Sequence, residues 1–172
     1  MPELPAAHPA LMVASAFLLE ALVLSFFLGF SHWQSWGIPL QDALARFSYG
    51  LMPALFALAG VGLFARKRWG WWIALGAALA MLLTTPGTGV ALLRYASPFE
   101  GEGAARFVVG FVLMALARTG WHLILLLALL RDDVRQRLEV THWEPARAVT
   151  VTALACAVLS FGTFALQVSF GW

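Results

Sequence analysis

Five long apolar stretches, separated by short polar connections, dominate the pattern along this chain. They cover residues 10–30, 44–65, 71–93, 107–130 and 148–170, with ends defined to within several residues. Each is long enough to cross a membrane as a helix, which takes about 20 residues. Because a bilayer offers no water to backbone N–H and C=O groups, a crossing segment satisfies them internally as an α-helix. The pattern therefore predicts an all-α fold: a polytopic integral membrane protein with a bundle of five transmembrane helices in a single domain, residues 1–172.

Composition leads to the same class of protein. Of the 172 residues, 61% are hydrophobic and 12% are charged, and the mean hydropathy is +0.81, whereas about a quarter of the residues of a soluble domain are charged. The net charge of +2 arises from few residues, which flank the apolar stretches, so nucleic-acid binding has no support. Cys156 is the only cysteine, which excludes an intrachain disulfide and a thiol-rich metal site.

Basic residues are distributed unequally between alternate connections. One side carries Arg66, Lys67 and Arg68 between the second and third stretches, and Arg131, Arg135, Arg137 and Arg147 between the fourth and fifth; the other side carries Arg46, Arg94 and Arg106. Cytoplasmic loops are enriched in Lys and Arg. Both basic loops are therefore expected in the cytoplasm, with the N-terminus cytoplasmic and the C-terminus outside, in a multi-pass protein of the cell inner membrane.

The second basic connection also carries local helix signals. Asp133 and Arg137 stand four residues apart in the order that supports a helix, which predicts that the fourth helix continues past residue 130. The segment 141–144, Thr-His-Trp-Glu, has the capping-box pattern and is followed by Pro145. The fifth helix is therefore expected to begin there.

Small residues recur at helical spacing in the second and third stretches. Ala57, Gly60 and Gly62 lie in the second stretch, and Ala74 and Ala78 lie in the third. Small side chains let helix backbones approach closely. This pattern predicts tight packing of these two helices, either against each other or against a partner.

Two charged residues lie near the middle of apolar stretches. Glu20 falls about halfway along the first stretch and Arg118 about halfway along the fourth. A charge inside a membrane costs several kcal/mol unless it is paired or hydrated. We therefore expect both side chains to face the bundle interior and to pair. Two interpretations stay open: a buried polar site on a substrate or proton pathway, and a structural ion pair that fixes the first helix against the fourth.

His122 follows Arg118 by four residues, so both project from one face of the fourth helix. It could be an axial ligand of a haem or pigment, a proton carrier, or a partner in a hydrogen bond between helices. A bis-histidine haem needs a second histidine at similar depth, and none of the others is well placed, although His8 comes closest. Interhelical hydrogen bonding is therefore the favoured expectation, and no cofactor or metal is predicted.

An interruption is expected in the outer half of the third helix. It comprises Thr84, Thr85, Pro86, Gly87, Thr88 and Gly89. Proline removes a helical hydrogen bond, and the two glycines weaken the helix further. The segment predicts either a kinked or unwound stretch that lines a binding site, or a helix that ends near Thr85.

The chain lacks the motifs of membrane enzymes. It has no His-Glu-x-x-His helix, no aspartate pair for intramembrane proteolysis, no Gly-x-Ser-x-Gly and no cysteine pair. We therefore expect a non-enzymatic subunit, scaffold or assembly partner of a larger inner-membrane complex or homo-oligomer. Its partners would be the lipid bilayer and other membrane subunits or further copies of the chain. The alternatives are a small transporter or channel with a midplane polar site at Glu20, Arg118 and His122, and a haem- or pigment-binding redox subunit.

Overall fold

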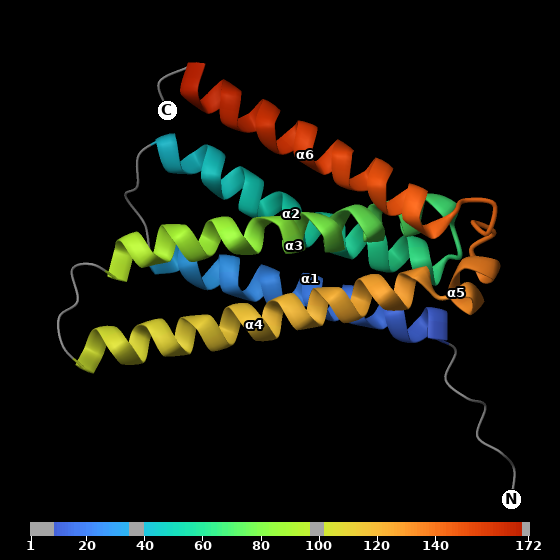
Figure 1. Ribbon diagram of the computed structural model, residues 1–172, viewed down its shortest axis with the longest axis horizontal. Coiled ribbons are helices and arrows are strands. Elements are labelled where there is room, and N and C mark those ends of the chain that lie inside the picture. Colours follow the sequence, from blue (N-terminus) through green and yellow to red (C-terminus); the bar gives the residue numbers. More distant parts are fainter. Residues whose placement is uncertain (1–8, 35–39, 97–101, 170–172) are drawn as a thin grey trace, which may run out of the picture.

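The computed structural model describes residues 9–34, 40–96 and 102–169, and side chains for 9–26, 51–83 and most of 105–159. Within these ranges every regular element is a helix. They are α1 (Pro9–Gln34), α2 (Leu40–Phe64), α3 (Arg68–Ala96), α4 (Glu102–Leu130), α5 (Asp132–Arg137) and α6 (Pro145–Ser169). The five long helices run along the long axis of the molecule, and short α5 lies at one end (Figure 1).

The predicted all-α bundle is confirmed, since each apolar stretch corresponds to one long helix. By length and composition, two segments of the described chain are able to cross a membrane, Pro9–Phe26 of α1 and Val108–Leu130 of α4. Shorter apolar helical segments occupy Leu51–Phe64, Arg68–Leu83 and Pro145–Leu159. Five crossings and their orientation therefore stay predictions.

The outer surface of the bundle is apolar on several helices. Leu22 of α1 is 67% exposed, Leu113 of α4 is 61% exposed and Val158 of α6 is 69% exposed. Water-soluble monomers rarely expose large contiguous apolar patches. This surface fits contact with lipid or with other apolar helices.

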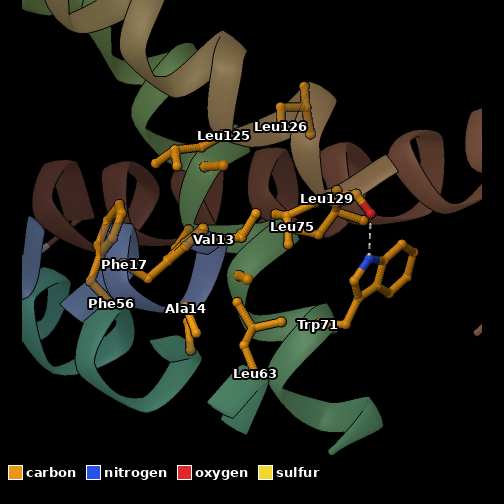
Figure 2. Close-up of a cluster of buried hydrophobic side chains, with 14 of the residues drawn as sticks. Val13, Ala14, Phe17, Phe56, Leu63, Trp71, Leu75, Leu125, Leu126 and Leu129 are labelled. Carbon is orange, nitrogen blue, oxygen red and sulfur yellow. Dashed lines mark hydrogen bonds between the residues drawn. The ribbon is translucent and has the colours of Figure 1, made fainter. Parts of the chain in front are cut away.

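The core lies where α1, α2, α3 and α4 meet toward the end that carries α5 (Figure 2). Phe17 of α1 stacks on Phe56 of α2, with ring centroids 5.3 Å apart. Trp71 of α3 is completely buried and donates its indole N–H to the carbonyl oxygen of Leu129 at 2.9 Å. The first contact joins α1 to α2, and the second joins α3 to α4.

Two glycines set the separation of α2 and α3. A Cβ atom added to Gly62 would lie 2.5 Å from the Cα of Gly70, so neither position has room for a side chain. The turn between the helices is a Schellman motif: Lys67 N–H donates to Gly62 C=O at 2.8 Å, and Arg66 adopts the left-handed conformation with φ of 55°. Tight packing of these helices against each other is thereby confirmed.

The connection from α4 to α6 differs from the sequence prediction. α4 does not continue past Leu130, because Arg131 is extended (φ −62°, ψ 140°) and a separate helix, α5, begins at Asp132. The change in direction buries Val134 and Leu138, which are both completely buried in the core. α6 begins at Pro145, where the capping-box pattern places the start of the fifth helix.

Neither an unwound stretch at residues 84–89 nor an end near Thr85 is observed, because α3 is helical through this segment and ends only at Ala96. A kink within the continuous helix stays a prediction. A proline inside a helix forfeits one backbone hydrogen bond, whereas an unwound stretch leaves several polar groups without partners. The continuous helix is the less costly arrangement in apolar surroundings. The side chains of this segment lie outside the described residues.

Candidate functional site

His122 is the most deeply buried polar side chain at the contact between α1 and α4. It stands eight residues before the end of α4 at Leu130, which is about 12 Å along the helix. Its residue exposure is 0%. The ring packs edge-on against Phe56 of α2, with centroids 5.9 Å apart. Its Nδ1 atom lies 2.8 Å from the backbone carbonyl oxygen of Arg118, one turn earlier in the helix.

Glu20 of α1 faces this histidine. One carboxylate oxygen, Oε1, lies 3.6 Å from His122 Nε2. The other, Oε2, accepts a hydrogen bond from the indole N–H of Trp121 at 3.1 Å. The Glu20 side chain is 16% exposed, against 1% for His122. The carboxyl group thus lies at the edge of the α1–α4 contact, with the imidazole beneath it.

Arg118 does not pair with Glu20, which corrects the expected ion pair. Its guanidinium nitrogen Nη2 lies 3.4 Å from the sulfur of Met81 on α3. Arg118 stands one helical turn, about 6 Å, beyond His122, and at this register the carboxylate reaches Trp121 and His122 instead. The structure therefore brings Glu20 and His122 together and leaves the Arg118 residue exposed.

The sequence interpretation missed the role of Trp121 as the hydrogen-bond donor to Glu20. Tryptophan is an N–H donor with an apolar body, so it suits a carboxylate at the edge of an apolar contact. The available signal was its position beside His122 on α4.

An ion pair also links the two basic connections. Arg68, at the start of α3, pairs with Glu139 at 2.5 Å, which links the two predicted cytoplasmic loops. The two loops therefore lie close together in the structure, and their cytoplasmic location stays a prediction. Arg66, Lys67 and Arg137 are exposed there.

Arg135 has a different role from its neighbours. Its side chain is 6% exposed and pairs with Asp132 at 2.9 Å. It also donates to the backbone carbonyl oxygens of Thr141, at 3.3 Å, and of Trp143. Arg131, in contrast, is an exposed residue whose guanidinium binds the Asp133 carboxylate at 3.0 Å. Arg135 thus stabilises the α5–α6 connection from within.

No group of three or more metal-ligating side chains occurs in the part of the chain that the structure describes. His122 has its Nδ1 engaged by a backbone carbonyl and its Nε2 facing Glu20. A haem iron at Nε2 would have to displace the carboxylate.

Comparison with known proteins gave no match: no family model, no curated protein and no solved structure corresponds to this chain.

Proposed function

We propose that this chain is a five-helix protein of the cell inner membrane that acts, without enzymatic activity, as a subunit or assembly partner of a larger membrane complex. Support comes from the apolar outer surface of the helices and from two basic connections at one end, which the Arg68–Glu139 ion pair links. Basic connections on one side are typical of cytoplasmic loops. In this orientation the N-terminus is cytoplasmic and the C-terminus is outside.

One observation carries the subunit role: Arg118 is an exposed charge near the middle of an apolar helix whose other exposed residues are largely hydrophobic. It stands twelve residues before Leu130, about 18 Å along α4, which is near the centre of a hydrocarbon layer about 30 Å thick. Among the described residues, its guanidinium has a contact with Met81 and no carboxylate within ion-pair distance. An arginine at this depth costs about 2.5–3.5 kcal/mol.

A second membrane chain would remove this cost. An acidic side chain at mid-membrane depth on a neighbouring helix forms a charge-assisted, bidentate hydrogen bond with a guanidinium. Met114 and Trp121, four residues before and three residues after Arg118 on the same face of α4, are exposed and supply an apolar surface for that neighbour. The partner is therefore a transmembrane helix with a carboxylate, from another subunit or from a second copy.

Native mass spectrometry of the protein extracted in mild detergent tests this proposal. The expected result is a complex of fixed stoichiometry that Arg118→Met dissociates. Arg137→Met is the matched control, because Arg137 is an exposed arginine at the basic end, and it should leave the complex intact. A wild-type protein that is monomeric, or an Arg118→Met complex of unchanged stoichiometry, contradicts the subunit role.

A second candidate function is transport through a midplane site, and the contact between Glu20 and His122 favours it. A carboxyl group and an imidazole in contact can carry protons across an apolar layer. Proton flux into proteoliposomes that is lost in Glu20→Gln would support transport. Proton flux equal to that of empty vesicles would contradict transport and leave the subunit role as the one proposed function.

A further inference from the structure

The hydrogen-bonding partners of His122 determine where its hydrogen atoms lie. A backbone carbonyl oxygen can only accept a hydrogen bond. The Nδ1 atom, 2.8 Å from the carbonyl oxygen of Arg118, must therefore carry a hydrogen and donate it. In the neutral form of the ring, the other nitrogen, Nε2, then has a lone pair and no hydrogen.

That second nitrogen points to Glu20. Nε2 is buried and has no hydrogen bond within the described part of the protein, and the Glu20 oxygen Oε1 lies 3.6 Å away. A neutral imidazole and an ionised carboxylate would place two lone pairs against each other at this contact. One added hydrogen, on either Nε2 or Oε1, makes the contact attractive. A shift of roughly 0.5–1 Å would then bring the two atoms within hydrogen-bond distance.

We propose that Glu20 and His122 form a binding site for one exchangeable proton between α1 and α4. The proton has two positions: on Nε2, as an imidazolium beside a carboxylate, or on Oε1, as a carboxylic acid beside a neutral imidazole. The pair has the same total charge, zero, in both states, so moving the proton between them requires no further charge to enter or leave the site. The hydrogen bond from Trp121 to Oε2 holds the carboxyl group in place in both.

The surrounding side chains favour a single proton. From α4, the positive Arg118 guanidinium lies one turn from His122, and α2 and α3 contribute the uncharged Phe56 and Met81. A second proton would leave an imidazolium with no carboxylate partner beside another cation. Loss of the only proton would restore the contact between two lone pairs. The inference stands whether or not a partner covers the Arg118 surface.

Glu20 and His122 differ in how far their side chains are exposed at the surface of the bundle. The Glu20 side chain is 16% exposed and the His122 side chain is 1% exposed. The proton therefore enters and leaves through the carboxyl group, and the imidazole stores it. Exchange with solvent should depend on Glu20.

Protonation of the pair can be measured directly in the full-length protein in detergent. Nitrogen-15 NMR of labelled histidine reports the hydrogens on Nδ1 and Nε2, and infrared spectroscopy reports a protonated carboxyl group. At neutral pH we expect Nδ1 to be protonated, and one further proton on either Nε2 or Glu20. A ring that lacks the hydrogen on Nδ1, or a pair that holds no further proton or two, overturns the proposal.

Glu20→Gln is the most informative variant. Its amide oxygen can accept from Trp121 and its NH2 group can donate to Nε2, so every partner is satisfied without a shared proton. The histidine should then be neutral, with hydrogen on Nδ1 only, and the extra proton should be absent. An unchanged proton count in Glu20→Gln overturns the site. Glu139→Gln, a carboxylate at the basic end paired to Arg68, is the control and should leave the His122 signals as in the wild type.

Transfer into D2O tests exchange. In the wild type, the signal of the shared proton, or the infrared band of the carboxylic acid, should change within minutes. A proton that persists for many hours in the folded protein overturns its assignment as exchangeable.

Discussion

The indole N–H of Trp71 binds the backbone carbonyl oxygen of Leu129 at 2.9 Å, across the contact between α3 and α4 (Figure 2). Leu129 is the penultimate residue of α4, and the last four carbonyl groups of a helix have no partner within it. Trp71 and Leu129 are both completely buried, so water cannot serve this carbonyl. The tryptophan side chain of α3 thus supplies a hydrogen bond to a backbone carbonyl group at the C-terminal end of α4.

Trp71→Phe should destabilise the bundle, because phenylalanine has no donor and leaves the Leu129 carbonyl without a partner. The expected loss is about 1–3 kcal/mol for the buried polar group, with a further loss from the smaller ring. Thermal unfolding in detergent measures it. Trp69→Phe is the control, since Trp69 is 45% exposed; equal losses in the two variants would contradict the role of the hydrogen bond.

Gly70→Ala should also destabilise the protein. The added Cβ would lie 2.6 Å from the Gly62 Cα and 2.7 Å from the Leu63 nitrogen, so the backbones of α2 and α3 would have to separate. Overpacking of this kind costs about 1–3 kcal/mol. Gly110→Ala has the opposite expectation, because an added Cβ there meets no atom within 4 Å and alanine favours the helix by up to about 1 kcal/mol. Denaturant titration should separate the two variants, and a shift of the same sign in both would disprove the close approach.

Arg135→Met should loosen the α5–α6 connection. Methionine retains much of the apolar volume but leaves the carbonyl groups of Thr141 and Trp143 without their charged donor. Loss of hydrogen bonds from a charged group costs about 1.5–3 kcal/mol. Limited proteolysis of residues 138–144 should therefore become faster in this variant. The Arg137→Met variant should be cleaved at the wild-type rate. Identical rates for the two variants would show that Arg135 does not hold this segment.

Asp133 should make a small contribution to stability that depends on pH. Hydrogen bonds from the Arg131 guanidinium lower the pKa of the Asp133 carboxyl group below its ordinary value. Because the pKa is lower in the folded protein, this contribution is complete above the unfolded-state pKa of about 4. It is lost as the pH falls through the folded-state pKa.

Acid unfolding curves of Asp133→Asn and Arg131→Gln check this expectation. Both variants should lose part of the wild-type dependence on pH below about 4. The effect should be small, since exposed ion pairs contribute little. A variant curve that superimposes on the wild-type curve at every pH would refute the contribution.

The long helices could be predicted from the apolar stretches because backbone polar groups in apolar surroundings require continuous helical hydrogen bonding. Their ends were less predictable: α4 begins at Glu102 rather than near residue 107, and α3 continues to Ala96. Helix α5 was missed because the spacing of Asp133 and Arg137 favours continuation by only about 0.2–0.5 kcal/mol. Burial of Val134 and Leu138 outweighs a preference of that size.

At the candidate site, sequence position predicted which helices meet but not which side chains touch. Glu20 and the Arg118–His122 turn of α4 lie at similar depth, and the structure brings them together. Whether Glu20 contacts Trp121 and His122 or pairs with Arg118 depends on a relative shift of one helical turn between α1 and α4. Apolar patterning does not determine such a shift, because the neighbouring turns of both helices are equally hydrophobic.

The position of α6 bears on the order in which the protein is assembled during synthesis. Its packing within the described residues is mainly against α3, and among its side chains at residues 145–159, the part whose burial is described, Ala148 and Thr152 alone are buried. The other buried positions in the described part of the chain belong to segments that leave the ribosome earlier. The bundle of α1 to α5 can therefore close before α6 is translated, and α6 then joins a surface that is already formed.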